Sequence, residues 1–522
     1  MTYKLTYSTM FNPPEEMHHR FDDALETVKA GLGAAHAMYI DGDDVRTART
    51  TIKRSPIDQR VVLGHCPAGD AADVDRAVRA AKRAFTAWRR TPMVDRVALV
   101  RRVAALLEER VYTIGAAMSI EVGKNRMESL GEAQETADFF RGYAADFERN
   151  NGFDRALPDD PLDGWASHNR SVLKPHGVWA VIAPFNYPLA LAGGPTAAAL
   201  VTGNTVVLKG ATDTPWAGRL LADCIRDAGV PPGVFNYVIG GGSTVGEALV
   251  HHPDLAGATF TGSFDVGMRI LQALSSGRWP RPCIAELGGK NPCIVTAKGD
   301  LERAVTGIVR SAYGLSGQKC SALSRVYVEK AVADEFISRL AARIQTLTVG
   351  DPTRRENYMG PVISARAAAD FDACCSKLAE GGGRVLLGGT RLTDGDLAHG
   401  HFVAPTLAEA PADHPLFQEE MFMPILMVNR VKDFEEGLRR ANDTRLGLTA
   451  GCYGSRDEVT AFLDGIEAGV TYVNRPQGAT TGAWPGYQAF GGWKGSGSTG
   501  KAIGSFYYLP QYLREQSQTW VE

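Results

Sequence analysis

Residues 177–274 alternate between short apolar stretches and longer amphipathic ones, and this alternation decides the fold. The apolar, β-favouring stretches are GVWAVIAPF (177–185), TVVLKG (205–210), VFNYVIG (234–240) and LAGATFTG (255–262). Helical stretches such as TPWAGRLLADCIRDAG (214–229) separate them. Strands that alternate with helices predict a doubly wound parallel sheet of the α/β class. Such sheets bind ligands beyond the carboxyl ends of their strands, so the residues after each strand are the first candidates for a site.

The remainder of the chain extends this organisation on both sides. Residues 1–150 are expected to be mainly helical, because stretches such as 71–109 repeat apolar residues every three or four positions. The polar, proline-broken run 154–174 is typical of a hairpin that leaves the domain body. A second alternation from 282 to 473 predicts a second α/β domain. The β-favouring C-terminal stretch 505–522 is expected to pair as a strand, with another subunit as its expected partner.

Composition excludes several classes of protein. With 522 residues, 44% hydrophobic residues and a formal net charge of -3, the chain is predicted to be globular and to have no nucleic-acid partner. We find no apolar run long enough to cross a membrane and no apolar core of a signal peptide, so we expect a cytoplasmic protein. The eight cysteines are scattered and form no C-x-x-C pair. Disulfides and a metal site are therefore not expected.

Three glycine-rich stretches could contact phosphate groups. Residues 240–246 follow a predicted strand and resemble a loosened dinucleotide motif. Residues 495–501 have P-loop spacing, but Ala502 replaces the required hydroxyl residue and no apolar strand precedes them, which disfavours nucleotide hydrolysis. Gly262 and Ser263 end a strand immediately before a helix, where free N–H groups and the helix dipole favour an anion.

Cys320 stands out among the thiols because small residues flank it and Lys319 precedes it, in the stretch SGQKCSA. Most isolated cysteines are structural, but a positive field would lower a thiol pKa and make it nucleophilic. Glu286 follows an apolar strand in AELGG, where a desolvated carboxylate could act as a base. Asn186, in APFNYP, follows another strand and is either a turn residue or an amide donor for an oxyanion.

Taken together, the motifs resemble those of the aldehyde dehydrogenase superfamily. They occur in the family's order over nearly the whole chain: IAPFNYP, GNTVVLK, AGVPPGVFN, FTGSFDVG, ELGGKNP, GQKCSA, EEMF-x-P, NDTRLGLTAG and FGGWKGSG. This resemblance implies an aldehyde dehydrogenase fold with three parts. The expected parts are a cofactor-binding domain (1–153 and 175–283), a catalytic domain (284–495) and a β oligomerisation arm (154–174 and 496–522). It also implies a homodimer or a higher homo-oligomer.

The resemblance also implies the chemistry. Cys320 would attack an aldehyde carbonyl, and the side chain of Asn186 with the backbone N–H of Cys320 would hold the oxyanion. Transfer of a hydride to the nicotinamide would leave a thioester, which water activated by Glu286 would hydrolyse to the carboxylic acid. A non-catalytic scaffold with this fold is the alternative from another class, but it predicts the loss of Cys320 or Glu286, and both are present.

The expected cofactor is NAD or NADP. The residues that the resemblance assigns to it are Ala183, Pro184, Phe185, Lys209, Thr212, Gly262, Ser263, Gly267, Leu287, Glu420 and Phe422. Thr212 departs from the family, because a glutamate usually stands there to accept a ribose hydroxyl and repel a 2′-phosphate. NADP is therefore expected to be accepted beside NAD or to be preferred. Met423 also departs from the family by replacing a common glycine.

The substrate end resembles one subfamily, the L-glutamate-γ-semialdehyde (1-pyrroline-5-carboxylate) dehydrogenases, in the loop TGAWPGYQAFGG (481–492). That resemblance implies substrate contacts from Ser321, Gly482, Ala483, Phe490 and Phe185. Trp484 and Pro485 are unlike the subfamily. Another semialdehyde, or an aliphatic or aromatic aldehyde, therefore stays open as the substrate.

Overall fold

The computed structural model describes residues 5–6, 9–476 and 484–522, and its first sheet contains the predicted parallel strands. In spatial order the sheet is β12-β11-β8-β9-β10-β2-β3. The bounds are β8 (Val178–Ile182), β9 (Thr205–Lys209), β10 (Phe235–Val238), β11 (Leu255–Thr261), β12 (Cys283–Glu286), β2 (Met38–Ile40) and β3 (Asp43–Val45). Strands β8 to β12 are parallel and lie on both sides of β8, so the doubly wound prediction is confirmed.

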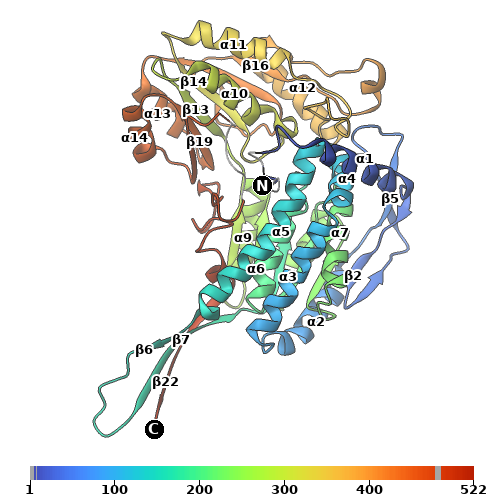
Figure 1. Cartoon of the computed structure of the whole chain (residues 1–522), viewed down its shortest axis with the longest axis vertical. Helices are drawn as coiled ribbons and strands as arrows, with labels where there is room; N and C mark the ends of the chain where they lie inside the picture. The colour runs from blue at the N-terminus through green and yellow to red at the C-terminus, as the bar shows by residue number, and fades with distance from the viewer. Residues whose placement is uncertain (1–4, 7–8, 477–483) are drawn as a thin grey trace.

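Helices pack around this sheet (Figure 1), some against its strands and the others against neighbouring helices. They are α1 (Glu15–Ala30), α2 (Ala71–Trp88), α3 (Met93–Glu109), α4 (Val111–Val122), α5 (Arg126–Arg149), α6 (Ala190–Val201), α7 (Pro215–Asp227), α8 (Glu247–Val250) and α9 (Phe264–Ser275). Helix α6 is apolar on all sides and buried, and it packs closely on α5. Gly193 allows that approach, since a Cβ there would lie 2.4 Å from Cγ2 of Thr136. The central helices are therefore fixed against the sheet that carries the site.

A second seven-stranded sheet confirms the second α/β domain, with the spatial order β15-β16-β17-β14-β13-β19-β20. Its strands are β13 (Asn291–Val295), β14 (Leu323–Glu329), β15 (Arg384–Leu387), β16 (Thr406–Glu409), β17 (Ile425–Val431), β19 (Thr449–Tyr453) and β20 (Val470–Val473). Its helices are α10 (Leu301–Tyr313), α11 (Ala333–Gln345), α12 (Ala365–Glu380), α13 (Phe434–Asn442) and α14 (Arg456–Gly465). A two-stranded pair, β18 (Leu446–Gly447) and β21 (Trp493–Lys494), lies apart from this sheet.

The N-terminal region is mainly helical, as expected, but it also contains strands that the sequence did not predict. Besides β2 and β3 it contains a small sheet of β1 (Ala34–Ala35), β5 (Val62–Pro67) and β4 (Thr50–Arg54). These strands have six residues or fewer, which is too short for a periodic signal. The expected domain boundary after residue 283 is also displaced. It falls inside β12, which pairs with β11 over four residues and so belongs to the first sheet.

A three-stranded arm extends from the body and ends near the C-terminus (Figure 1). It consists of β6 (Asp154–Leu157), β7 (Ser167–Pro175) and β22 (Leu513–Val521), and β22 pairs with β7 of the same chain along its whole length. The expected pairing of this strand with another subunit is therefore replaced by pairing within the chain. The expected arm segment 496–522 is also too long, because Tyr508 and Tyr512 are buried in the first core. No helix in the described ranges is long and apolar enough to cross a membrane.

Candidate active site

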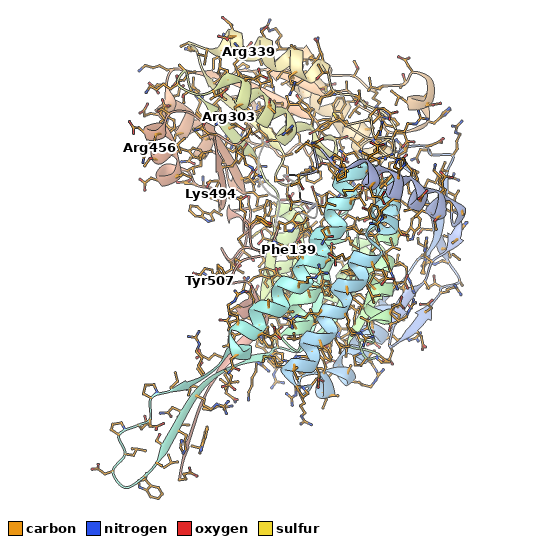
Figure 2. All side chains as sticks on the ribbon, viewed as in Figure 1. Phe139, Arg303, Arg339, Arg456, Lys494 and Tyr507 are labelled. Atoms are coloured by element: carbon orange, nitrogen blue, oxygen red, sulfur yellow. The ribbon has the colours of Figure 1, made fainter. Side chains whose placement is uncertain are left out.

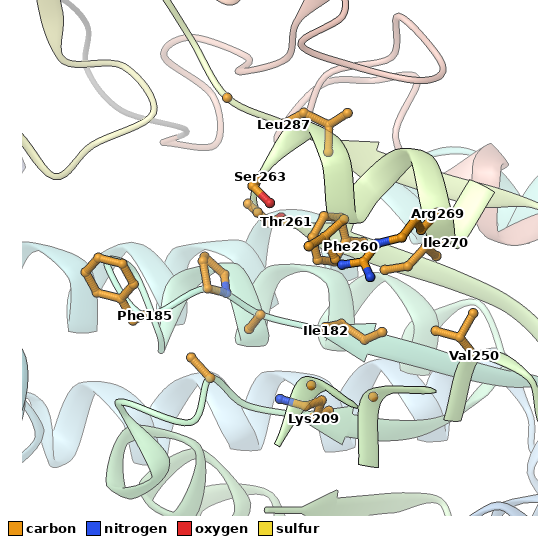
Figure 3. Close-up of a pocket in the computed structure, with 18 of the residues that line it drawn as sticks. Ile182, Phe185, Lys209, Val250, Phe260, Thr261, Ser263, Arg269, Ile270 and Leu287 are labelled. Atoms are coloured by element: carbon orange, nitrogen blue, oxygen red, sulfur yellow. The ribbon is translucent and has the colours of Figure 1, made fainter. Parts of the chain in front are cut away.

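One cavity collects most of the predicted site residues at the carboxyl ends of the first sheet (Figure 3). The predicted residues that line it are Ala183, Pro184, Phe185, Asn186, Lys209, Gly262, Ser263, Leu287, Cys320, Glu420 and Phe422. The thiol from one sequence motif and the strand end that was predicted to bind an anion therefore line the same cavity.

Other predicted residues lie beside this cavity. Thr212 is exposed, and its hydroxyl lies 3.4 Å from the carbonyl oxygen of Gly240. Gly267 is buried in α9, where a Cβ would lie 2.3 Å from Cδ2 of Leu287. The requirement for glycine at 267 is therefore a packing requirement in this structure, and Gly267 does not line the cavity.

An unusual backbone path presents Cys320. The chain leaves α10 through the turn η3 (Gly314–Gly317), in which Leu315 and Ser316 have φ of 48° and 53°, and Gly317 has φ of 68°. Left-handed backbone is costly for residues other than glycine, so the surroundings must hold it. The Ser316 hydroxyl donates to the carbonyl of Gly360 at 2.7 Å. This hydrogen bond therefore holds the turn before Cys320 against the backbone at Gly360.

The side-chain amide of Asn291 also holds the loop that carries Cys320, and sequence reasoning missed this residue. Its amide group donates to the carbonyl oxygens of Cys320 and Ala322 at 2.7 and 2.8 Å, and its own oxygen accepts from the N–H of Thr449 at 2.9 Å. It directly follows Lys290 in ELGGKNP. A polar residue at the start of a buried strand was the available signal, because such a side chain needs partners.

Lys319 does not act on the thiol as a free positive charge. Its ammonium pairs with the carboxylate of Glu128 on α5 at 2.5 Å, and the same carboxylate accepts the N–H of Leu315 at 3.2 Å. Glu128 is almost fully buried. The expectation that Lys319 would lower the thiol pKa is therefore not met, and Lys319 anchors the loop to α5 instead.

Burial controls the acidity of the Cys320 thiol. Desolvation raises its pKa to about 12, and the carboxylates of Glu420 and Glu286 act in the same direction. The N–H groups of Ser321 and of Cys320 itself oppose this rise through hydrogen bonds. In the free protein the thiol is therefore protonated at neutral pH.

This state predicts how the free protein reacts with iodoacetamide. Alkylation of Cys320 should accelerate by about tenfold per pH unit from about pH 7 to about pH 10, because the thiolate fraction grows in that proportion below the pKa. Peptide mapping by mass spectrometry separates Cys320 from the half-buried Cys374 and Cys375. A rate for Cys320 that levels off near neutral pH would contradict the assigned acidity.

Glu286 ends β12 but does not line the cavity. Its carboxyl group is buried, which raises its pKa well above the usual value, and the N–H of Gly492 donates to it. The second oxygen, Oε2, is buried and has no hydrogen-bond partner among the described residues. The carboxyl must therefore ionise and turn toward the cavity before it can contact a reactant there.

Asn186 follows β8 at the cavity wall and is only 2% exposed. Within the described residues, no hydrogen bond engages its side-chain amide. An unengaged amide at this position favours the oxyanion donor over the alternative of a turn residue that caps its own backbone.

Glu420 and Phe422 line the cavity, and Gly288 leaves the room that Glu420 occupies. A Cβ on Gly288 would lie 2.0 Å from Oε2 of Glu420, and the N–H of Gly289 donates to Oε1 of Glu420 at 2.9 Å. Burial raises the pKa of Glu420 to about 7. Phe422 has φ of 58° and packs edge-on against Phe185, with ring centroids 5.8 Å apart. The glycines of ELGG thus seat the protein's own side chains.

Met423, whose effect the sequence left open, is buried in the core of the second domain and makes no contact with the cavity. Its carbonyl lies against Gly317, where a Cβ would approach the Met423 oxygen to 2.3 Å. The backbone around Met423 therefore supports the turn before Cys320.

Arg269 on α9 is a cavity residue that sequence reasoning missed (Figure 3). It shares one helix face with Val266, Ile270 and Ala273, which also line the cavity. That spacing of three and four residues was visible in TGSFDVGMRILQA. In the described part of the chain the guanidinium has no carboxylate partner, so it offers positive charge to an anionic or aromatic ligand.

Most of the described residues predicted to contact the substrate do not line the cavity, unlike most of those predicted for catalysis and for the cofactor. Ser321 and Phe490 do not line the cavity, and Phe490 is buried with its backbone bridged to Ile503. Gly482 and Ala483 lie outside the described residues. Trp484, directly after them, is buried, and its indole N–H donates to Asp138 on α5 at 2.7 Å. The departure at Trp484 therefore attaches this loop to α5.

Comparisons with known proteins agree with this site. The model of the aldehyde dehydrogenase family matches residues 44–517. The 1-pyrroline-5-carboxylate dehydrogenase of Geobacillus thermodenitrificans is 36% identical over 95% of this chain and 94% of its own length. That of Bacillus subtilis is 34% identical over 96% of both.

Solved structures give the same result. A 1-pyrroline-5-carboxylate dehydrogenase from Thermus with bound NAD superposes with a TM-score of 0.92 at 34% identity, covering 99% of both chains. Betaine aldehyde dehydrogenase from Staphylococcus aureus, in complex with NAD+, gives 0.87 at 27% identity, covering 94% of this chain and 95% of its own. This chain belongs to the aldehyde dehydrogenase family.

Proposed function

We propose that the protein oxidises L-glutamate γ-semialdehyde, the open form of 1-pyrroline-5-carboxylate, to glutamate in proline catabolism, with NAD or NADP as the hydride acceptor. The observation that carries the proposal is the shared cavity, in which Cys320 and Asn186 lie beside the anion-binding end of β11. Relatives that are 34–36% identical over nearly the whole chain act as support, since their names specify this activity.

The reaction begins with attack of the Cys320 sulfur on the aldehyde carbon. The thiol proton passes to solvent water as the carbon–sulfur bond forms, and the electron pair of the carbonyl π bond moves to the oxygen, which becomes an oxyanion. The amide of Asn186 and the backbone N–H of Cys320 donate to this oxyanion. Both donors are fixed before the reaction, because Asn186 is buried and Asn291 holds the Cys320 carbonyl.

The cavity fits a dinucleotide. Ser263 is the N-cap of α9 and its hydroxyl makes no cap hydrogen bond, so this hydroxyl and the helix N-terminus would hold a pyrophosphate. The ammonium of Lys209 donates a hydrogen bond to the carbonyl of Gly210 at 2.9 Å. Burial is the main reason why the pKa of Lys209 is lowered to about 8. Glu420 and Phe422, which line the cavity, would position the nicotinamide ribose and ring. When bound, the nicotinamide accepts the hydride that leaves the carbon attached to Cys320.

Glu286 completes the cycle as the general base for hydrolysis of the thioester. Its ionised carboxylate takes a proton from water, the oxygen attacks the thioester carbon, and the Cys320 sulfur leaves. Ser321, Phe490 and Phe185, together with Gly482 and Ala483, remain the proposed contacts for the amino and carboxylate end of the substrate.

Product analysis tests the proposed reaction. With pyrroline-5-carboxylate, the protein should form one glutamate per reduced nicotinamide. A semialdehyde of equal length without the α-amino group should react more slowly. Good turnover of simple aldehydes with no turnover of pyrroline-5-carboxylate would assign another substrate to the same site.

Thr212 predicts the cofactor preference. In the variant Thr212→Glu, the ratio of kcat/KM for NADP to that for NAD should fall by about tenfold, because a carboxylate there repels a 2′-phosphate. Thr212→Gln, which has nearly the same size without the charge, is the matched control and should fall less. An unchanged ratio in Thr212→Glu would place the 2′-phosphate elsewhere.

The arm is the proposed interface of a homodimer or a larger homo-oligomer. It leaves Trp165 and Trp520 exposed at 65% and 46%, and the outer edge of β22 is unpaired in the described chain. Trp165→Asp with Trp520→Asp should lower the oligomeric mass in sedimentation. Val94→Asp on α3, at an equally exposed apolar position, should leave it unchanged. An unchanged mass in the arm variant would exclude the arm as the interface.

The cytoplasm is the proposed compartment. All eight cysteines are free thiols, and a reducing compartment maintains that state.

A further inference from the structure

A ladder of buried rings crosses the first domain close to Glu286. It runs from Phe139 and Tyr143 on α5, through Tyr508 and Tyr512 in the turn η6 (Leu509–Tyr512) and the residue before it, to Trp179 on β8. Successive ring centroids are 5.7, 5.4, 5.4 and 4.8 Å apart. Figure 2 labels Phe139 on α5 and the exposed neighbour Tyr507. As packing, this ladder explains the burial of the rings but not the placement of their hydroxyl groups.

The hydroxyl groups form a directed line of hydrogen bonds. The indole N–H of Trp179 donates to Oγ1 of Thr259 at 3.0 Å, Thr259 lies 2.9 Å from Oη of Tyr512, and Tyr512 donates to Oη of Tyr508 at 2.9 Å. An indole N–H can only donate, so Thr259 accepts from Trp179 and passes its own proton to Tyr512. The line therefore ends on Tyr508, whose hydroxyl proton has no acceptor among the described residues.

Glu286, in contrast, has a hydrogen-bond acceptor for which the described residues supply no donor. Its Oε2 is buried and without a partner in the described ranges, while its other oxygen accepts the N–H of Gly492. Glu286 pairs in register with Thr261 on β11, two residues beyond Thr259, so the side chains of Glu286 and Thr259 project from the same face of the sheet. Burial is the main reason for the raised pKa of Tyr143, Tyr508 and Tyr512, and the charge of Glu286 raises each pKa further. An unused donor and an unused acceptor therefore lie on the same buried face of the sheet.

We propose that Tyr508 is a positioning residue that donates a hydrogen bond to the Glu286 carboxylate through one water molecule, at the end of the line from Trp179. This rests on the proposed role of Glu286 as the general base. A donated hydrogen bond favours the ionised carboxylate, and the preceding donors polarise the Tyr508 hydroxyl and strengthen it. The line thereby offsets part of the burial that otherwise keeps Glu286 protonated and unable to accept a proton.

Few other groups compete for this effect. The titratable groups that face Glu286 are Tyr143 from α5, Tyr508 and Tyr512 beside η6, and Cys320 from its loop. Among the described residues, no lysine, arginine or histidine contributes to the pKa of Glu286. Removal of one of these hydroxyl groups should therefore change the pKa of Glu286.

The test is Tyr508→Phe, which keeps the ring and removes the hydroxyl. A chromogenic aryl ester acylates Cys320 without any nicotinamide, so the burst reports acylation and the following phase reports hydrolysis by Glu286. Loss of the donated hydrogen bond raises the pKa of Glu286. The ascending limb of the hydrolysis profile should thus move by about one unit to higher pH, with a rate up to about tenfold lower below the pKa and an unchanged plateau above it.

Matched variants separate this outcome from general damage. Tyr507→Phe removes an exposed phenol one residue away and should leave the limb in place, whereas Tyr512→Phe should move it in the same direction by less. An unmoved limb in Tyr508→Phe would overturn the proposal, as would a limb that moves only in Tyr143→Phe. If Tyr508→Phe strongly lowers the thermal midpoint, the pH profile of hydrolysis by Tyr512→Phe is the deciding measurement. An ascending limb that does not move in Tyr512→Phe would then overturn the proposal.

Glu286→Gln keeps the two failures apart. If hydrolysis by this variant equals that of the wild-type protein, the proposed base is wrong. If Glu286→Gln abolishes hydrolysis and the Tyr508→Phe limb stays in place, the base is right and the positioning role of Tyr508 is wrong.

Discussion

Cys320→Ser is expected to lower kcat for aldehyde oxidation by three orders of magnitude or more, on the order of the losses seen when an enzyme's nucleophile is removed. A serine hydroxyl is a much weaker nucleophile than a cysteine thiol at neutral pH, so attack on the aldehyde should become very slow. Binding of the nicotinamide, measured by fluorescence titration, should stay within about twofold of the wild-type value, because the residues proposed to hold it are unchanged.

Cys375→Ser is the matched control, because it removes another half-buried thiol on α12 outside the cavity. It should retain the wild-type kcat. Normal oxidation by Cys320→Ser would refute the assignment of the nucleophile, and loss of activity in both variants would point to a general requirement for thiols.

Asn186→Ala is expected to show the second largest loss, about 10²- to 10³-fold in kcat, which is typical when one oxyanion donor is removed. The oxyanion exists only after attack by Cys320, so kcat and kcat/KM should fall together while KM changes little. Steady-state kinetics with a saturating nicotinamide measures both. The thermal midpoint reports on folding, because Asn186 is buried but makes no side-chain hydrogen bond within the described chain.

A rise in KM with an unchanged kcat would contradict the oxyanion role, since it would mean that Asn186 contributes only to ground-state binding. Asn186→Asp should be as slow as Asn186→Ala, because a carboxylate offers no donor and repels an oxyanion.

Sequence alone predicted the residues that follow strands. Asn186, Lys209, Ser263 and Glu286 each stand at or just beyond the carboxyl end of a strand whose apolar run was readable. A doubly wound sheet brings those ends to one edge, so a local pattern was enough to place them near one another. It was not enough to show that the Glu286 carboxyl lies outside the cavity, because the orientation of a side chain depends on neighbours from distant segments.

Residues that act through tertiary contacts could not be found in this way. Lys319 lies next to the thiol in sequence, yet its ammonium forms an ion pair with Glu128, which is 191 residues away in sequence. The stretch 495–501, which has P-loop spacing, instead carries Ser496, whose hydroxyl donates to the carbonyl of Gly288 at 2.6 Å. Both contacts join segments that only the folded chain brings together.

The fold shows the same division. The parallel strands of both sheets were visible as apolar runs, whereas β12 was placed in the wrong domain. A strand of four buried residues at a domain boundary carries no signal for the sheet that it joins. The C-terminal strand was recognised by its composition, but its partner was not. Only the register between Leu513–Val521 and Ser167–Pro175 identifies that partner as β7.

The central claim is tested most directly by the turnover of pyrroline-5-carboxylate compared with that of a straight-chain aliphatic aldehyde, followed by the absorbance of the reduced nicotinamide with NAD and with NADP. The account predicts that kcat/KM for pyrroline-5-carboxylate is higher by at least about tenfold with the better cofactor. A higher kcat/KM for the aliphatic aldehyde, with no reduced nicotinamide formed from pyrroline-5-carboxylate, would contradict it.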